Sequence, residues 1–532
     1  YSYREAERQG YVVMQEEKEK PIENLAVEVD KEQLEPVECT IHGELPEWLS
    51  GSLYRIGAGK YRFGQDRANH MFDGMALINK WTFDKGRVLY KNQFLRSDTF
   101  KRNMAAQRIV ISEFGTHGYP DPCRSVFSRY IMYFFEGLSD NTSVNLMQLG
   151  DQLYCMTETR YMTKIAPDTL DRLDKIDLSN IVSVLGASAH PHLDRDGTTY
   201  NVGGSFGRNS CYRVITIPPA QRGDQHPEQK MSVLASIPTR FPREVSYYHS
   251  FGITDNYVVF VEQPYRMNAL SILLNMSTKR KTFKDIIQWH GDDHAIFHLV
   301  SKRSGDIVSS RYRAPPFFTF HHLNAYEEDG HVVVDLCGYD DASVVDHLSL
   351  DYMEGAQGPC AVSNIRRFVL PVQIEKVPSE NQVTLDNTTA SAVWKEEEAI
   401  MLCTPEIFED ATVDLPRYNY NYNTRRYRYV YGVDVTCFTR ALKYDLLTRS
   451  CLYFGERHDA HHLVSEPVFV ARPGGQEEGD GVVLVVFVSK TGDAPSYMSI
   501  LDPGSFTELA RAEVPQHVRL NFTFHGLFSD TL

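Results

Sequence analysis

The sequence predicts an all-β fold built as a β-propeller, and three observations support this. Short runs rich in β-branched and aromatic residues recur from Ser52 to the C-terminus. Turn signals such as Asp84–Gly86 and Glu328–Gly330 separate them. The pattern continues for several hundred residues without a linker, which favours sheets repeated around an axis over a single sandwich. The strand-like runs are Val88–Phe94, Gln107–Ser112, Gln152–Met156, Tyr257–Glu262, His331–Leu336, Arg367–Leu370 and Val482–Val488.

The chain reads as one domain behind a short arm. Residues 1–34 are expected to form a flexible N-terminal arm, and residues 35–532 a single propeller domain. Lys376–Thr388 and Gly474–Asp480 are expected to be surface loops. The polar segment Tyr1–Lys20 does not have the pattern of a secretory leader.

Composition excludes several classes of protein. The 532 residues carry 55 basic and 70 acidic side chains, a formal charge of −15, which argues against a nucleic-acid partner. The longest apolar run is of strand length, so no membrane-spanning helix is expected. The nine cysteines are scattered without a C-x-x-C pair, which argues against a disulfide framework and favours a reducing, intracellular compartment.

Two segments break the β pattern and suggest peripheral contact with a membrane. Ser125–Glu136 places apolar residues at helical spacing, which is typical either of a core-facing helix or of an amphipathic helix on a bilayer. Leu270–Met276 is apolar and is followed by a basic stretch, which fits a second membrane contact or a buried turn. Cys123, beside the first segment, is interpreted as a buried thiol in preference to a lipid attachment site.

Four histidines stand at the edges of strand-like runs, flanked by small or aromatic residues. They are His190, His249, His321 and His525, with separations of 59, 72 and 204 residues. A four-stranded blade takes roughly 60–75 residues, so these gaps match one, one and about three blades. Because the inner strands of all blades face one axis, the four imidazoles can converge on one metal ion.

Local motifs are more specific than this spacing. The sequence contains, in order, GSLYRIG at 51–57, HMFDGMAL at 70–77, EFGT at 113–116, PDPC at 120–123, TET at 157–159, SEP at 465–467 and FHG at 524–526, together with the four histidine motifs. From about residue 35 to the end, the chain resembles the animal carotenoid cleavage oxygenases. That resemblance implies a seven-bladed propeller with a helical and loop cap over an axial non-haem Fe(II).

The resemblance also implies the site. The iron ligands would be His190, His249, His321 and His525, and no catalytic side chain is expected beyond the iron centre. Three outer carboxylates, Glu158, Asp414 and Glu466, would bond to His249, His321 and His525 respectively. Asp414 departs from the family motif, which carries glutamate, so its shorter side chain is expected to need a backbone shift or a bridging water.

The implied reaction is cleavage of one carotenoid C=C bond by O₂ into two carbonyl products. Short matches, including RIGAGK at 55–60 and KRSG at 302–305, resemble β,β-carotene 9′,10′-oxygenases most, and central 15,15′ cleavage is the alternative. A retinyl ester isomerohydrolase of the same fold is a further alternative, because it shares all four histidines. The expected location is cytoplasmic or mitochondrial, with peripheral membrane association.

Two other classes of protein, serine hydrolases and non-catalytic carriers, fit the sequence less well. GGSFG at 203–207 satisfies the G-x-S-x-G pattern of serine hydrolases, but that motif needs a strand, a turn and a helix, and a strand is expected to follow it. A carrier without catalysis is expected to lose metal ligands, whereas all four histidines are present here.

Overall fold

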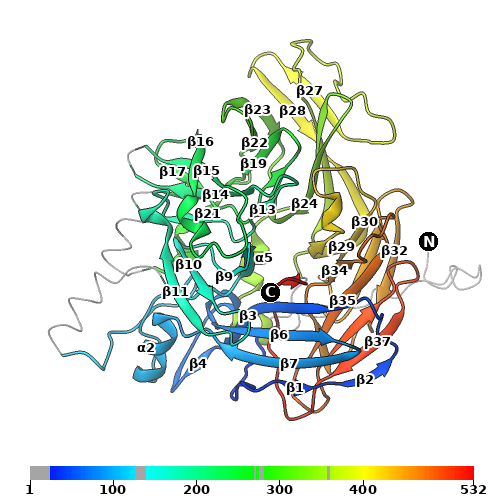
Figure 1. Cartoon of the computed structure of the whole chain (residues 1–532). Helices are drawn as coiled ribbons and strands as arrows, with labels where there is room; N and C mark the ends of the chain where they lie inside the picture. The colour runs from blue at the N-terminus through cyan, green and yellow to red at the C-terminus, as the bar shows by residue number, and fades with distance from the viewer. Residues whose placement is uncertain are drawn as a thin grey trace, which may run out of the picture.

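The computed structural model describes residues 24–125, 139–207, 209–268, 271, 274, 281–355 and 360–532. In these residues the protein is almost entirely antiparallel β-sheet with a few short helices. The sheets follow one another around the molecule in chain order, from the blue N-terminal sheet through green and yellow to red (Figure 1). The all-β prediction is therefore confirmed.

The first half of the chain forms four sheets and a small hairpin. The first sheet contains β1 (Val37–Glu38), β7 (Arg87–Phe94), β6 (Met75–Asp84), β3 (Gly51–Lys60) and β38 (His525–Ser529). The second contains β11 (Arg172–Asp177), β10 (Tyr161–Ile165), β9 (Gln152–Met156) and β8 (Asn145–Leu149). The third contains β12 (Gly186–Ala187), β14 (Thr199–Ser205), β15 (Cys211–Ile217) and β16 (Ser232–Pro238), with β13 (His192–Leu193) beside β14. A three-stranded sheet contains β17 (Glu244–Ser246), β20 (Tyr265–Asn268) and β21 (Ile287–Trp289), and the hairpin pairs β4 (Arg62–Phe63) with β5 (Asp66–Arg67).

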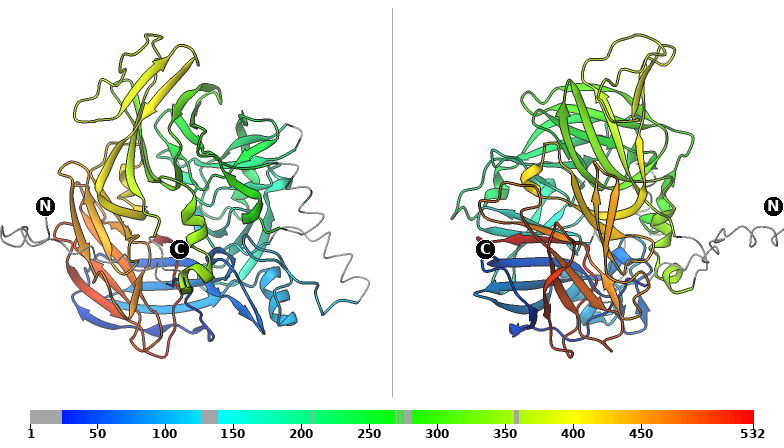
Figure 2. Two further views of the ribbon diagram at one scale, coloured as in Figure 1. Left: turned by 180° about the vertical axis from the view of Figure 1, so that it is seen from behind. Right: turned by 90° about the vertical axis from the view of Figure 1, so that its right-hand side faces the viewer.

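Three larger sheets complete the described structure. One contains β18 (Gly252–Ile253), β19 (Tyr257–Glu262), β22 (Ala295–Ser301), β23 (Ile307–Ala314), β28 (Ile400–Thr404) and β27 (Ser391–Lys395), and its last two strands project from the body (Figures 1 and 2). The next contains β24 (Phe318–Glu328), β25 (His331–Tyr339), β26 (Asn364–Pro371), β29 (Glu406–Arg417), β30 (Tyr429–Asp434), β31 (Ala441–Asp445) and β32 (Ser450–Phe454). The last contains β2 (Thr40–Gly43), β37 (Glu508–Glu513), β36 (Tyr497–Leu501), β35 (Gly481–Ser489) and β33 (His462–Val464), with β34 (Val468–Ala471) beside β35.

The helices are short and lie between the strands. The α-helices are α2 (Asp98–Ala106), α5 (Ser343–His347) and α6 (Leu350–Gly355), and the 3₁₀ helices are η2 (Met71–Asp73), η3 (Leu178–Asn180), η4 (Pro227–Lys230), η5 (Lys284–Ile286) and η6 (Tyr420–Tyr422). In the part of the chain that is described, no helix has the length and apolar character needed to cross a bilayer.

The two ends of the described chain exchange strands. The C-terminal strand β38 pairs antiparallel with β3 of the first sheet, with Ile56 opposite His525. In return, β2 from the N-terminal part pairs with β37 of the last sheet. Each end of the described chain thus contributes a strand to the sheet formed mainly by the other end.

Hairpin turns fix the register of two major strand pairs. Lys85 and Gly86, between β6 and β7, have φ of 50° and 77°. Asp329 and Gly330, between β24 and β25, have φ of 42° and 76°. Two-residue turns with both φ positive match the right-handed twist of the flanking strands. Both turn signals are therefore confirmed.

The structure also decides three smaller expectations, on a strand, a serine motif and a cysteine. Gln107–Ser112 is not a strand: Gln107 ends α2 in the left-handed conformation, with φ of 48°, and its backbone N–H caps the helix. Ser205 ends β14, and β15 follows it, so the serine-hydrolase context is missing. All nine cysteines are free, but Cys123 is exposed, so the buried-thiol interpretation was wrong.

The predicted N-terminal arm coincides only partly with described residues. Residues 1–23 lie outside them, whereas Leu25, Val27 and Val29 are buried against the body. The Val29 N–H donates to the carbonyl of Gly59, 2.8 Å away. Three residues of the predicted arm, Leu25, Val27 and Val29, are thus packed on the body.

We expect Leu53→Ala, in β3, to lower the free energy of unfolding by about 2–5 kcal/mol, because Leu53 is fully buried opposite Phe528 of β38. Urea unfolding at constant metal content measures this. The matched control is Leu447→Ala, which is 66% exposed and should change stability by less than about 0.5 kcal/mol. Equal costs for the two variants would contradict a core that spans the β3–β38 junction.

Candidate metal centre

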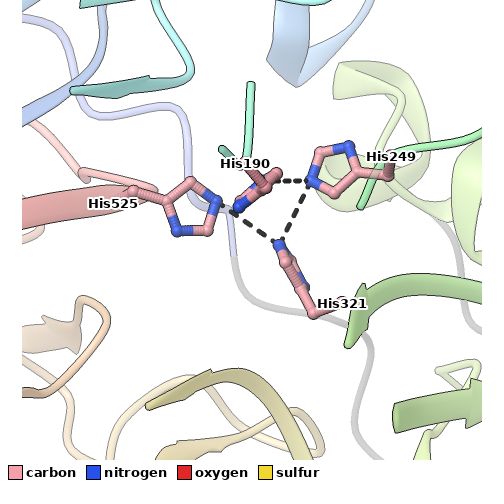
Figure 3. Close-up of side chains that lie close together, drawn as sticks. All are labelled: His190, His249, His321 and His525. Atoms are coloured by element: carbon pink, nitrogen blue, oxygen red, sulfur yellow. Dashed lines mark hydrogen bonds between the residues drawn. The ribbon is translucent and has the colours of Figure 1, made fainter. Parts of the chain in front are cut away.

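Four histidines from four separate segments point their rings at one another (Figure 3). His190 lies in the turn between β12 and β13, and His249 lies between β17 and β18. His321 is in β24, and His525 opens β38. One ring nitrogen from each lies within 4.8 Å of the others. The four residues that the sequence singled out therefore meet in space.

Serine hydroxyls tie neighbouring ligand segments together. Ser188 Oγ donates to the carbonyl of His249 at 2.5 Å and accepts from the backbone N–H of His190 at 3.0 Å. Ser250 Oγ donates to the carbonyl of Phe320, just before His321, at 2.6 Å. Each of these serines lies within two positions of a histidine ligand, in the sequences ASAH at 187–190 and HS at 249–250. The hydrogen bonds account for the serine in both sequences.

The nitrogen separations suit a bound metal ion. The Nε2 atoms of His190 and His249 are 2.9 Å apart, those of His249 and His321 3.2 Å, and those of His321 and His525 3.3 Å. Two imidazoles bonded to one ion at ~2.1 Å each have nitrogens ~3.0 Å apart at a right angle and ~3.4 Å apart at a tetrahedral angle. Two of the observed separations lie between these values, and the shortest is within 0.1 Å of the right-angle value.

Three carboxylates bond to the outer nitrogens of three of these rings. His249 Nδ1–H donates to Glu158, His321 Nδ1–H to Asp414 at 2.6 Å, and His525 Nδ1–H to Glu466 at 2.9 Å. Each of the three rings therefore carries its proton on Nδ1 and turns the lone pair of Nε2 inward. Carboxylate–histidine pairs of this kind orient metal ligands and raise their basicity.

Asp414 reaches His321 directly, without a bridging water. The register of β29 against β30 shifts between Asp414 and Arg417, and Leu415 adopts a φ of 50°. This irregularity bends the strand at the aspartate. Asp414 Oδ2 also accepts from Tyr339 Oη at 2.5 Å, which fixes the carboxylate from its other side.

Burial and nearby charges set the protonation of the cluster. Burial lowers the pKa of His190 well below its usual range and that of His525 to about 4, so both rings are neutral near pH 7. Burial alone would raise the pKa of Glu466, but Arg417, His525 and Arg55 hold it below its ordinary value. Neutral imidazole is the form that binds a metal ion.

Without a cation, at least three lone pairs would face one another in a buried space. A divalent ion removes this repulsion, and Glu158, Asp414 and Glu466 balance its charge around the neutral ligands. The side chains present therefore fit a metal ion of the kind that imidazole prefers. These are iron, copper, zinc and nickel.

Further residues that the sequence reasoning missed hold the carboxylates. Tyr247 Oη donates to Glu158 at 3.0 Å, and Arg417 lies 3.3 Å from Glu466. The fully buried Arg55 donates to the carbonyl of Glu466 at 2.8 Å. Tyr247 and Arg417 lie within three residues of His249 and Asp414 in the sequence, so proximity was an available signal. Arg55 lies within the GSLYRIG motif, but Arg55 and Tyr339 are distant in sequence from Glu466 and Asp414, so the sequence did not connect them.

Two neighbouring histidines bond elsewhere. His192 Nε2–H donates to the carbonyl of Phe251 at 2.8 Å, and His322 Nδ1 lies 2.8 Å from Ser250 Oγ. Neither belongs to the group of four.

An apolar cavity of about 550 Å³ reaches the cluster. His249, His321 and His525 form part of its lining, and α5 and η5 contribute residues from another side. Aromatic rings make up much of the wall, including those of Phe72, Phe114, Tyr247, Phe320, Tyr339 and Phe524. Such a cavity suits an elongated apolar ligand beside the metal.

His70 supports this wall from behind. Its ring packs edge-on against Phe72 and Phe114, with centroids 4.7 and 5.1 Å away. Its Nε2–H donates to the carbonyl of Val345 at 2.8 Å, and its Nδ1 accepts from the backbone N–H of Phe72 at 3.2 Å. Burial lowers the pKa of His70 to about 4.

Comparison with known proteins agrees with this site. The model of the family described as "Retinal pigment epithelial membrane protein" matches residues 26–530. The chain belongs to this carotenoid oxygenase family. The matched range of residues contains all four histidines and all three carboxylates.

Relatives within the family are dioxygenases by name. The human β,β-carotene 15,15′-dioxygenase is 38% identical over 520 residues, which cover 94% of this chain and 93% of the human protein. The mitochondrial carotenoid-cleaving dioxygenase of Mustela putorius furo is 40% identical over 512 residues, which cover 92% and 93%. The chain is thus an enzyme of the oxygenase type.

Solved structures share the fold. The Glu150Asp mutant of the Synechocystis apocarotenoid oxygenase superposes with a TM-score of 0.75 at 22% identity, covering 95% of this chain and 98% of that one. A cobalt-substituted form of the same protein gives the same values.

We expect His70 to make the protein less stable in acid. Its pKa is about 4 in the folded state and ~6.5 in the unfolded state, so only the unfolded chain takes up the proton between these values. The stabilisation is present above pH ~6.5 and is lost as the pH falls to about 4, on the order of 3 kcal/mol. Urea unfolding at several pH values should show a shallower dependence for His70→Gln. The exposed His226→Gln is the control, and identical slopes for both variants would contradict this assignment.

Proposed function

We propose that the protein is a non-haem Fe(II) dioxygenase that cleaves one C=C bond of a carotenoid with O₂. The observation that carries this proposal is the convergence of four imidazoles, three of which are backed by carboxylates and line a large apolar cavity. Copper, zinc and nickel also suit imidazole, but the named dioxygenase relatives favour a metal that activates O₂.

In this proposal the protein orients and shields the reactants. When bound, the iron supplies activation of O₂. The aromatic wall holds the polyene so that one double bond lies beside the cluster, and it excludes water. Both oxygen atoms of O₂ enter the products, since one C=C bond is replaced by two C=O bonds. No proton transfer is required, in keeping with the expectation that no side chain acts beyond the iron centre.

The position of cleavage has two candidates. Short sequence matches favour eccentric 9′,10′ cleavage, and 38% identity to a 15,15′-dioxygenase supports central cleavage equally well. Retinyl ester isomerohydrolysis is a second candidate function, because the matching family model is that of the retinal pigment epithelial membrane protein. Product chromatography after incubation with β-carotene or a retinyl ester separates them: two identical aldehydes, two unequal products or a free retinol.

The fold supports a seven-bladed propeller around this site. The seven-stranded sheet divides at β29 into two groups of four strands, β24–β25–β26–β29 and β29–β30–β31–β32. Counted this way, and setting aside the three-stranded sheet and the hairpin, the described strands form seven groups. The pairing of β38 with β3 would close the ring.

Peripheral membrane contact is the remaining part of the proposal. Ser125–Glu136 and Leu270–Met276 lie almost wholly outside the described residues. Ser139, Lys281 and Thr282, which follow these segments, line the cavity, and this supports a route for a lipid substrate. We place the enzyme in the cytoplasm or in mitochondria; two relatives carry "mitochondrial" in their names.

Alanine at His249 or His525 should remove both iron and activity. We expect bound iron to fall from about one per chain to a small fraction, and O₂-dependent aldehyde formation from carotenoid to fall at least 100-fold, because an imidazole ligand is lost. Metal analysis and product chromatography measure these. The exposed His226→Ala is the control. Full activity of His249→Ala would refute the four-histidine site.

Asp414→Asn tests the outer carboxylates. The amide keeps the size of the side chain but not its charge, so we expect iron affinity to fall about 10- to 100-fold. Competition with a chelator measures the affinity. Asp414→Glu restores the charge and should keep more affinity than Asp414→Asn; equal losses in both variants would contradict an electrostatic role.

A further inference from the structure

One carboxyl group faces the cavity and takes no part in the metal centre. Glu113, in the EFGT motif, lines the cavity and bonds to none of the four histidines. It lies in an irregular segment that its own backbone N–H pins to the carbonyl of Thr116 at 2.9 Å. The cavity that is otherwise mostly apolar thus contains an acid with no role in holding the metal.

Glu113 is held by one serine hydroxyl, Ser139 Oγ, which also lies 3.2 Å from Thr99 Oγ1. Ser139 Oγ accepts from the backbone N–H of Asn141 at 3.1 Å, and it donates to Glu113 Oε1 at 2.6 Å. Among the described residues, Ser139 is the one side-chain partner of Glu113, and Oε2 has none. Oε1 is therefore satisfied as an acceptor, and Oε2 is the atom available to a ligand.

Glu113 is surrounded by groups that favour its uncharged form. Burial raises its pKa well above the ordinary value, and the negative charges of Asp73 and Asp140 raise it further. Asp140 itself accepts from the backbone N–H groups of Asp98 and Thr99. A neutral carboxyl whose Oε1 accepts from Ser139 carries its proton on Oε2, which has no other hydrogen-bond partner among the described residues.

Aromatic rings connect this carboxyl to the metal centre. The ring of Phe114, the next residue, lies 5.7 Å from that of Phe72. Phe72 in turn lies 6.1 Å from Phe320 and 5.8 Å from Phe524, the residues that precede His321 and His525. A polyene lying along these rings would have one part beside the metal and another beside Glu113.

We propose that Glu113 is a specificity-determining residue that donates a hydrogen bond from Oε2 to an oxygen atom on the end group of the polyene. The favoured substrates are then carotenoids with a hydroxyl or keto group on the ring, over pure hydrocarbons. A buried polar group left without a partner is costly, so a site built this way rejects the analogue that lacks the oxygen. This inference rests on the proposed carotenoid cleavage and names the substrate class within it.

The test compares three substrates in three forms of the enzyme. The substrates are β-carotene, zeaxanthin with ring hydroxyls, and canthaxanthin with ring ketones. The forms are the wild type, Glu113→Gln and Glu113→Leu, and the readout is the ratio of kcat/KM for each oxygenated substrate to that for β-carotene. When each ratio is compared across the three enzyme forms, the difference in solubility between the substrates cancels.

We expect Glu113→Leu to lower both ratios about tenfold, the usual effect of losing one hydrogen bond in a buried site. Glu113→Gln should keep both ratios within about threefold, because Ser139 can donate to its amide oxygen and leave the NH₂ group to donate to the substrate. Binding of zeaxanthin to each form, followed by its visible spectrum, should weaken in the same order without turnover.

Two outcomes would overturn this inference. Unchanged ratios in Glu113→Leu would remove Glu113 from recognition, and a loss for zeaxanthin in Glu113→Gln as large as that in Glu113→Leu would exclude a neutral donor. Iron content and β-carotene cleavage are measured in the same samples. If these are normal, only the role of Glu113 fails; if the wild type cleaves no carotenoid, the proposed function itself fails.

Discussion

The structure depends on one constraint: imidazole nitrogens from four segments must be held about 3 Å apart with their lone pairs facing inward. Left to themselves these rings would turn away from one another or take up protons. The protein prevents both, because each of three rings is fixed from behind by a carboxylate and burial disfavours the imidazolium form. The resulting enclosed site has a negative electrostatic potential that favours a cation.

The carboxylates need support of their own, since a buried anion without partners is unstable. Tyrosines hold Glu158 and Asp414, and two arginines hold Glu466. The order of contacts therefore runs from the sheets through tyrosine or arginine to carboxylate, then to histidine and the metal position. The cavity wall continues this arrangement, because Phe320 and Phe524 directly precede two of the histidines.

The sequence predicted most of the metal centre and less of its surroundings. The four histidines and three carboxylates lie in motifs that a single sequence can display, and strand runs such as Gln152–Met156 coincide with β9. The roles of Arg55 and Tyr339 were not predicted, because their partners, Glu466 and Asp414, are distant in sequence. Only the packed sheets bring these residues together. The Gln107–Ser112 run failed because Ile109, Val110 and Ile111 are buried in an irregular segment after α2, and a short buried apolar run resembles a strand in sequence.

The pairing of β38 with β3 also bears on how the enzyme is made. His525 opens β38, the last strand of the chain, so no partial product of synthesis that stops short of residue 525 can assemble the group of four histidines. A growing chain on the ribosome, with three histidines already emerged, still lacks the fourth and the strand that positions it. The four-histidine cluster is therefore completed late in biogenesis, after the walls of the cavity have been synthesised.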